Sequence, residues 1–244
     1  MLENSHQISK HGGHISITKF RYLMIFQAMD ENSELISKKA FLQKLTTGKF
    51  IVISVTGDNR TYMLNEFTPS EDKSITRTII DQAKRALHFY QLEGTPFPDF
   101  KAQNLDDQQI TNKYFKGKTT ILKTWFISCK PCIAEMPELN KLVDKYSNTD
   151  IQFLSLALDK KEALLDFLEK TEFKYDVLPN QKNLILNDLN LSLFPTHIVV
   201  DQNGRIKKVF NSASQIMEFL EHSNSLTSKA SENKRSSTSA QKYF

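Results

Sequence analysis

The sequence predicts a mixed α/β fold in which helices cover both faces of one sheet, preceded by a smaller α+β unit. Three observations support this prediction. Apolar, strand-like runs alternate with helical patterns from residue 121 onward. The last two strand-like runs are separated by Asn203-Gly204, a dipeptide typical of hairpin turns. The only two cysteines, Cys129 and Cys132, stand where the first of these runs gives way to a helix.

Length and composition allow two packed units with a polar segment at each end of the chain. The chain has 244 residues, of which 39% are hydrophobic, and so exceeds one small domain. We expect a flexible start at 1–14, the α+β unit at 15–93, the main domain at 94–223 and a disordered, serine-rich tail at 224–244. Residues 226–244 contain four basic residues and one acidic residue, so most of the net charge of +4 belongs to the tail. This distribution gives little support to nucleic-acid binding.

The elements of the first unit are predicted from periodicity. An apolar run at 22–26 follows two basic residues, as in an export signal, but it is too short to span a membrane and no cleavage site follows it. We predict a helix at 37–45, strands at 50–55 and 62–67, and an amphipathic helix at 75–90. None of these ranges carries a motif that indicates a role.

In the main domain the expected order is strand, helix, strand, helix, hairpin and helix. An apolar run at 121–127 precedes the cysteines, and apolar residues then recur every three or four positions from Ile133 to Tyr146. Pro137 lies inside that helix and predicts a kink. The other expected elements are a strand at 151–158, a helix at 163–168, a short helix at 183–191, strands at 197–200 and 206–210, and a helix at 213–221.

The sequence Cys129-Lys130-Pro131-Cys132 has the arrangement of a reversible dithiol catalyst. The first thiol lies at a helix N-terminus, where unpaired N–H groups and the helix dipole stabilise a thiolate. Lys130 adds a positive charge that lowers the pKa of this thiol further. The second thiol lies in the first helical turn, close enough to resolve a mixed disulfide. We therefore expect a reductant or exchanger whose Cys129 sulfur is reachable from solvent.

Two other interpretations of the cysteine pair are weaker. A zinc site needs four ligands, but there is no third cysteine, and the six histidines show no ligand spacing near the pair. No metal is therefore expected. A purely structural disulfide that closes so short a loop would restrict the unfolded chain little.

Three segments, in the right order, resemble the TlpA/ResA-like branch of thiol–disulfide oxidoreductases in the thioredoxin-like superfamily. The segment GTPFPDF (94–100) resembles the entry to the domain. The segment YFKGKTTILKTWFISCKPCIAEMPELNKL (114–142) resembles the strand, active site and first helix. The segment FPTHIVVDQNGRI (194–206) resembles the proline loop and final hairpin. The resemblance covers about half the chain and implies a thioredoxin-like fold.

The resemblance implies a role for each matching residue. Cys129 would be the nucleophile and Cys132 the resolving thiol. Pro195 would be a cis proline that faces the dithiol; the alternative is an ordinary strand-entry proline. Trp125 would support the active-site loop from beneath, or be only a core aromatic residue. The residues assigned to substrate binding are Ser128, Lys130, Pro131, Phe194 and Thr196.

Two positions depart from the family pattern. Ser128 replaces an aromatic residue found in many relatives, and either opens the surface near the thiol or simply begins the helix. Lys123 stands where thioredoxins proper have a buried aspartate. Glu135 lies three residues after Cys132, on the same side of the helix. We hypothesise that Glu135 relays a proton to or from Cys132 with Lys123 as its counter-charge; the alternative is a solvated glutamate and a lysine that reaches out of the sheet.

The sequence thus favours an enzyme that reduces or exchanges disulfides in cysteine-containing proteins and draws electrons from an upstream thiol reductant. Its redox centre would be the Cys129–Cys132 disulfide, without a further cofactor. The alternatives are a peroxiredoxin-type peroxidase and a binding module switched by the disulfide. The resemblance implies the bacterial cell envelope or periplasm. Because no clear signal peptide is present, the cytoplasm is the alternative, and no transmembrane span is expected.

Overall fold

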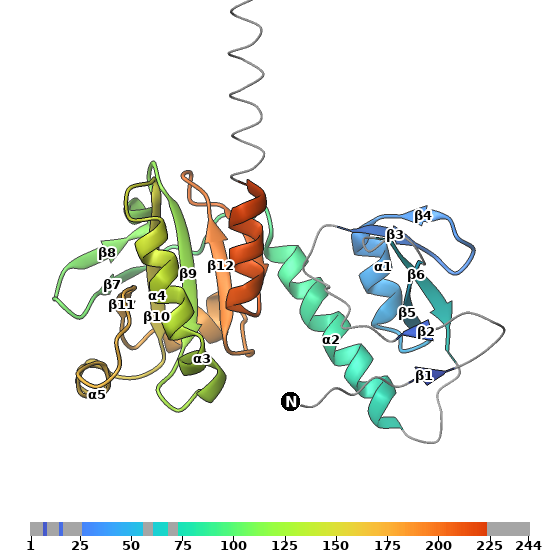
Figure 1. The fold of residues 1–244 in the computed structure, drawn as a ribbon, viewed down its shortest axis with the longest axis horizontal. Coiled ribbons are helices and arrows are strands. Elements are labelled where there is room, and N and C mark those ends of the chain that lie inside the picture. The colour runs from blue at the N-terminus through green and yellow to red at the C-terminus, as the bar shows by residue number, and fades with distance from the viewer. Residues whose placement is uncertain (1–6, 9–14, 17–25, 56–60, 68–72, 224–244) are drawn as a thin grey trace, which may run out of the picture. The chain divides into compact units, whose positions relative to one another are not determined.

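The structure is a computed structural model, which describes residues 7–8, 15–16, 26–55, 61–67 and 73–223. The chain divides into two compact units, unit 1 at Met1–Leu92 and unit 2 at Glu93–Phe244 (Figure 1). Most of the expected flexible start, the export-like run before Phe26 and the tail at 224–244 lie outside the described residues. Within the described residues, no helix combines the length and apolar character needed to cross a membrane.

Unit 1 is a small sheet covered by one helix, against which a second, longer helix packs. Its four-stranded sheet has the order β4-β3-β6-β5, and a separate two-stranded ladder pairs β1 with β2. The strands are β1 Gln7–Ile8, β2 Ile15–Ser16, β3 Gln27–Met29, β4 Leu35–Ile36, β5 Phe50–Ser54 and β6 Thr61–Glu66; the helices are α1 Lys38–Leu45 and α2 Lys73–Leu92. The expected helix at 37–45, the strand pair and the long helix are therefore present.

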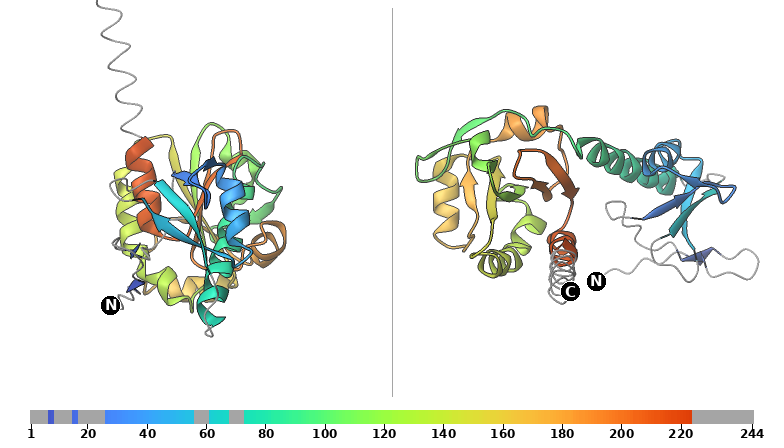
Figure 2. Two further views of the ribbon diagram at one scale, coloured as in Figure 1. Left: turned by 90° about the vertical axis from the view of Figure 1, so that its right-hand side faces the viewer. Right: turned by 90° about the horizontal axis from the view of Figure 1, so that it is seen from above.

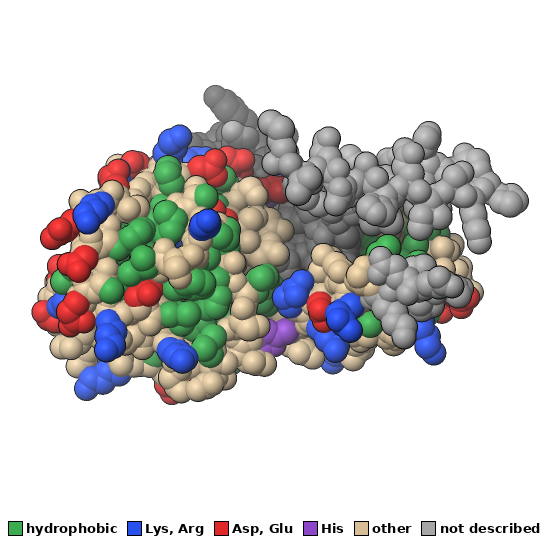
Figure 3. Space-filling model, turned by 90° about the horizontal axis from the view of Figure 1, so that it is seen from below, with side chains coloured by type: hydrophobic (Ala, Val, Ile, Leu, Met, Phe, Trp, Pro, Cys, Tyr) green, Lys and Arg blue, Asp and Glu red, His purple; other side chains and the backbone are tan. Residues whose placement is uncertain are grey.

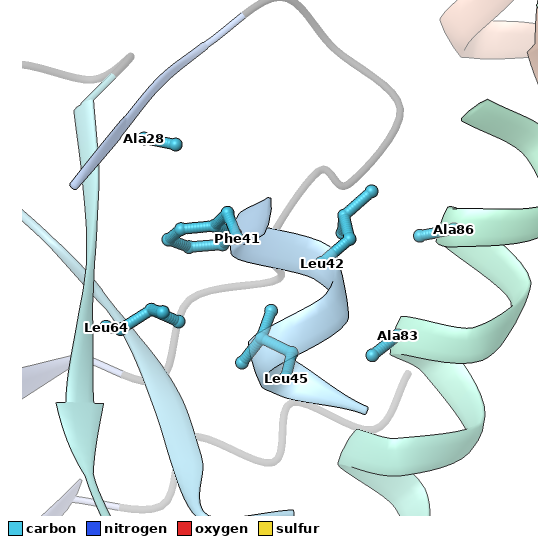
Figure 4. Packing of buried hydrophobic residues seen from close by; sticks show 7 residues of the cluster. All are labelled: Ala28, Phe41, Leu42, Leu45, Leu64, Ala83 and Ala86. Atoms are coloured by element: carbon cyan, nitrogen blue, oxygen red, sulfur yellow. The ribbon is translucent and has the colours of Figure 1, made fainter. Parts of the chain in front are cut away.

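The core of unit 1 lies on both sides of α1. Figure 4 shows Phe41 of α1 facing Ala28 and Leu64 of the sheet, while Leu42 and Leu45 face Ala83 and Ala86 of α2. The Ser37 side chain caps α1 by accepting a hydrogen bond from the Ala40 N–H at 3.2 Å. The amphipathic pattern read from the sequence thus buries one face of α2 against α1.

Unit 2 is built on a five-stranded mixed sheet with the order β11-β10-β9-β12-β13. The strands β9 Thr119–Trp125, β10 Ile151–Ala157 and β11 Asp176–Leu178 are parallel, and the hairpin of β12 Thr196–Val200 and β13 Ile206–Phe210 joins β9 through the antiparallel pairing of β12. The helices are α3 Lys130–Ala134, α4 Met136–Lys145, α5 Lys161–Leu168, the π-helical turn η2 Leu184–Asp188 and a last helix at 213–223. Seen from above, α4 and the last helix lie on one side of the sheet and η2 on the other (Figure 2).

The central strand and the helix after it position the dithiol. Strand β9 pairs with β10 on one side and β12 on the other, so both neighbours fix its C-terminal end. The helix that follows is interrupted at Glu135, two residues before Pro137, so the expected kink is present as a break between α3 and α4. A short hairpin of β7 Lys101–Gln103 and β8 Gln109–Thr111, followed by the 3₁₀ turn η1 Asn112–Phe115, precedes β9 and was not predicted.

Candidate active site

The two cysteines are joined by a disulfide at the N-terminus of α3. The Sγ atoms are 2.02 Å apart and the Cα atoms 5.2 Å apart. Cys129 is the N-cap of α3, and its sulfur accepts a hydrogen bond from the Cys132 N–H at 3.3 Å. The sulfur of Cys129 therefore occupies the anion-stabilising end of the helix that the sequence predicted.

The expected exposure of the dithiol needs correction. Cys129 is only 4% exposed and Cys132 is fully buried. Both belong to a buried cluster that also holds Trp125 and Met136, and the half-buried Phe194 packs on the same cluster. The neighbours Ser128, Lys130 and Pro131 are exposed. Cys129 is thus the only one of the two cysteines with any exposed surface. Figure 3 looks onto the lower end of unit 2, where α3 lies in Figure 1, and shows hydrophobic side chains gathered on this face.

The loop between β9 and α3 is held from the neighbouring strand. The Ile127 N–H donates to Asp159 Oδ2 at 2.8 Å, and the Leu158 N–H donates to the Trp125 carbonyl at 3.1 Å. Asp159 directly follows the strand predicted at 151–158, and parallel strands bring their C-terminal ends to one edge of the sheet. Its role as an anchor for the loop was not anticipated from the sequence.

The proline loop lies beside the active-site loop. The Phe194–Pro195 peptide bond is cis, as the resemblance implied. The Phe194 ring meets the Phe126 ring edge-on, with centroids 5.2 Å apart, so the two loops touch. The Thr196 side chain is buried and donates to the Leu193 carbonyl at 2.7 Å. Pro195 is buried as well.

Trp125 is the last residue of β9 and packs in the same cluster as the dithiol. Its side chain is fully buried in the same cluster as both cysteines, with ring centroids 5.9 Å from Phe167 and 5.6 Å from Phe173. Trp125 is therefore a core aromatic residue, and its support of the active-site loop stays a prediction.

A buried ionic cluster forms around Glu135. Glu135 Oε2 lies 2.8 Å from Lys123 Nζ and 2.9 Å from His197 Nε2. Its other oxygen, Oε1, accepts the Ala213 N–H at 2.9 Å. The side chains of Lys123 and His197 are 0% exposed and that of Glu135 is 17% exposed. The alternative of a solvated glutamate and an outward-reaching lysine is therefore wrong.

The electrostatics favour an ionised Glu135. Burial alone would raise the pKa of Glu135, but the hydrogen bond from His197 and the Lys123 ammonium outweigh it and lower this pKa to about 2. Burial lowers the pKa of His197 and the Lys123 charge adds to that effect, and together they outweigh the hydrogen bond and charge of Glu135, which raise it. Burial also lowers the pKa of Lys123, against the attraction of Glu135. A carboxylate with so low a pKa rarely holds a proton at neutral pH, which argues against the hypothesis that Glu135 relays one.

His197 was missed as a member of this cluster. In the sequence it is a lone histidine in an apolar strand, a pattern that gives no signal of function. The structure pairs His197 directly with Lys123 across β12 and β9, so both side chains leave the same face of the sheet. Only the strand register brings them together. Among the described residues, no three His, Cys, Asp or Glu side chains are grouped as a metal site requires.

Comparisons with known proteins agree on the domain that carries this site. Residues 94–209 match the AhpC/TSA family. A ResA thiol–disulfide oxidoreductase of Bacillus cereus is 30% identical over 114 residues, which cover 46% of this chain and 66% of the relative. A ResA of Geobacillus thermodenitrificans is 25% identical over 134 residues, or 54% of this chain and 77% of the relative. The match therefore spans just under two thirds of the length of the Bacillus cereus relative.

Solved structures agree on the fold. The thioredoxin domain of a thiol–disulfide oxidoreductase from Bacteroides vulgatus superposes with a TM-score of 0.50 at 20% identity, over 53% of this chain and 96% of that domain. At this identity the likeness concerns the fold alone.

Proposed function

We propose that this chain, whose residues 94–209 belong to the AhpC/TSA family of thioredoxin-like proteins, is a thiol–disulfide oxidoreductase that acts through Cys129 and Cys132. The observation that carries the proposal is the bonded cysteine pair at the N-terminus of α3, in which only Cys129 has exposed surface. A helix N-terminus lowers the pKa of a thiol, and the thiolate is the attacking form.

The chemistry is a two-electron exchange between dithiols. In the reducing direction, the Cys129 thiolate attacks one sulfur of a partner disulfide, and the other partner sulfur leaves as a thiolate. The Cys132 thiol then loses its proton and attacks the Cys129 sulfur. The intramolecular disulfide forms, the mixed disulfide breaks, and the second partner sulfur leaves. The two electrons passed to the partner are replaced by an upstream dithiol, which reduces Cys129–Cys132 again.

The surroundings of the dithiol suit a protein partner. The exposed residues Ser128, Lys130 and Pro131 surround the reactive sulfur, and Phe194 borders it from the proline loop. We assign these residues, with the backbone on either side of Pro195 and Thr196, to contact with an extended segment of a cysteine-containing protein. We place the protein in the bacterial cell envelope, on the resemblance to TlpA/ResA-like proteins.

Trapping of the mixed disulfide tests the function. Cys132→Ala removes the resolving thiol, so Cys129 is expected to remain covalently bound to its partner until dithiothreitol releases it. The matched variant Cys129→Ala should trap nothing and should lose reductase activity on a model disulfide protein. If both single variants reduce the model substrate at the wild-type rate, the proposed exchange mechanism is wrong.

Two further measurements separate the alternatives. A peroxidase would consume hydrogen peroxide at the expense of an added dithiol, which we do not expect here. A redox-switched binding module would bind a partner in one redox state without forming a covalent adduct in Cys132→Ala. Covalent trapping without peroxide consumption is the outcome that supports thiol–disulfide exchange.

A further inference from the structure

Four elements of unit 2 meet at the carboxylate of Glu135, which follows Cys132 by three residues. Lys123 comes from β9 and His197 from β12, where they are direct cross-strand partners. Glu135 lies at the break between α3 and α4, and the Ala213 N–H comes from the first residue of the last helix. Each contact is 2.8–2.9 Å long. The cluster therefore joins the helix that carries the cysteines to the strand that follows Pro195.

We propose that Lys123 and His197 are positioning residues for the exchange chemistry, which hold Glu135 as an anion and balance its charge so that the cluster beside Cys132 stays electrically neutral. The inference rests on the proposed function, because it describes what tunes the same two thiols. It assigns these two buried residues a role in setting thiol reactivity rather than only in packing.

The hydrogen bonds define the state of each group. An ionised Glu135 only accepts, so His197 must donate its Nε2–H to Oε2. The other ring nitrogen, Nδ1, is buried and has no hydrogen-bond partner within the described part of the chain. A proton added at Nδ1 would create a buried cation beside the Lys123 ammonium, and burial and Lys123 lower the pKa of His197 by more than its contacts with Glu135 raise it. His197 therefore stays neutral, and Lys123 and Glu135 cancel each other.

The groups that face the cluster support this charge state. From β9 the charged neighbour of His197 is Lys123, and from the α3–α4 break it is Glu135. The residue of β13 opposite His197 is Phe210, which is apolar. Tyr175 senses the Glu135 charge, and burial together with that charge raises its pKa, so the phenol remains protonated. The last helix contributes a backbone N–H, which also favours the anion.

The cluster is close enough to act on the dithiol. Glu135 follows Cys132 by three residues and keeps right-handed helical backbone angles, so the two Cβ atoms are about 5–6 Å apart. A net charge at this distance from a buried thiol shifts its pKa. A cluster whose charges cancel therefore leaves the thiol pKa unchanged, whereas a cluster with a net charge shifts it.

Charge removal and rescue test the role of Lys123. In the reduced protein, the rate at which iodoacetamide alkylates Cys129 is measured across a range of pH. This rate reports the fraction of Cys129 that is present as thiolate. Lys123→Met leaves a net negative charge, so alkylation at neutral pH should slow about tenfold, which corresponds to one unit of thiol pKa. Lys123→Met combined with Glu135→Gln restores neutrality and should restore the rate. The control Lys145→Met removes an exposed lysine that pairs with Glu221 and should leave the rate unchanged.

Donor replacement tests the role of His197. The ionisation of Glu135 is followed by ¹³C NMR of its carboxyl carbon. His197→Leu removes the donor and should raise the pKa of Glu135 by about one unit or more, whereas His197→Gln keeps a donor near the Nε2 position and should preserve the wild-type titration. If His197 served only in packing, both variants would change the stability of the protein, but the pKa of Glu135 would not differ between His197→Leu and His197→Gln.

The proposal is overturned if Lys123→Met and its double variant alkylate equally slowly, or if Glu135 titrates identically with leucine and glutamine at position 197. Should Lys123→Met not fold, Glu135→Gln alone leaves a net positive charge and must speed alkylation instead. Neither readout uses a protein partner. A failed trapping experiment with these results intact would reject the proposed exchange function and leave the charge balance standing.

Discussion

Lys130 is exposed and directly follows Cys129, so we expect its charge to act on the Cys129 sulfur through solvent rather than through a buried contact. We expect Lys130→Glu to raise the pKa of the Cys129 thiol by roughly one unit, because it replaces an attractive charge by a repulsive one beside the thiolate. The ultraviolet absorbance of the thiolate against pH measures the change, and the pKa of Cys129 in Lys130→Met should fall between those of the wild type and the glutamate variant. Salt should reduce the difference, since exposed charges are screened. Overlapping titrations of the glutamate variant and the wild type at low salt would contradict the prediction.

Glu135 makes folding stability depend on pH in acid. Its pKa is about 2 in the folded protein against an ordinary value of 4.5. A group with a depressed folded pKa stabilises fully above its unfolded pKa and loses that contribution as pH falls toward the folded one. The shift corresponds to a loss of about 3 kcal/mol between about pH 5 and pH 2, at about 1.4 kcal/mol per unit. Urea unfolding of the oxidised protein across this range should show the loss in wild type and not in Glu135→Gln. Parallel pH curves for the two proteins would contradict it.

At the scale of residues, sequence reasoning identified the groups that have chemical signatures and missed those defined by three-dimensional contact. The cysteine spacing pointed to Cys129 and Cys132, and helical spacing with charge complementarity paired Glu135 with Lys123. His197 and Asp159 were missed because their partners come from neighbouring strands. The burial of Cys129 was missed for the same reason, because Phe194 packs on the cysteine cluster from a loop 65 residues later in the chain.

At the scale of elements, the long amphipathic helices and buried strands of both units follow from periodicity, because each has enough residues to show its period. The hairpin of β12 and β13 follows from Asn203-Gly204, and Gly204 indeed adopts a positive φ of 77°. The strands β7, β8 and β11 have three residues each, too few for a period of two to be recognised. Pairing with neighbouring segments determines where these strands lie, and the local sequence pattern does not predict that pairing.

The loop that presents the dithiol depends on one side chain of the adjacent strand end. Asp159→Ala removes the acceptor of the Ile127 N–H, and we expect a loss of about 1–3 kcal/mol in unfolding free energy. Hydrogen exchange of the Ile127 amide should become faster, because the loop opens more readily. Asp166→Ala on the exposed side of α5 is the matched control and should change neither quantity. Unchanged protection of Ile127 in Asp159→Ala would show that another contact holds the loop.

At the scale of the whole molecule, each unit has a hydrophobic cluster of its own among the described residues. The buried residues of the unit 1 cluster are drawn entirely from between Ala28 and Ala86, and those of the cluster around the dithiol lie entirely between Trp125 and Val177. Every contact assigned to the candidate site lies within unit 2. We therefore propose that unit 2 folds and performs thiol–disulfide exchange without unit 1, whose own role the sequence motifs do not define.

The boundary for testing this independence follows from the first residues of unit 2, which are bound to the final hairpin. The Gly94 N–H donates to the Ile206 carbonyl at 2.7 Å, the Phe97 N–H donates to the Gly204 carbonyl at 2.8 Å, and Glu93 pairs with Lys208. A chain starting at residue 93 keeps these contacts, whereas one starting at residue 101 loses them together with the buried Phe97.

We expect residues 93–244 to unfold cooperatively and to equilibrate with glutathione as the full chain does, within about twofold, because the contacts assigned to the candidate site all come from unit 2. The chain that starts at residue 101 should be less stable by several kcal/mol, since burial of one large aromatic side chain alone contributes about 3 kcal/mol. Thermal unfolding measures the stability of each shortened chain, and the glutathione equilibrium constant measures its redox exchange. If residues 93–244 are unfolded, or exchange with an equilibrium constant altered about tenfold or more, unit 1 contributes to the domain, and the division of labour proposed for the two units is wrong.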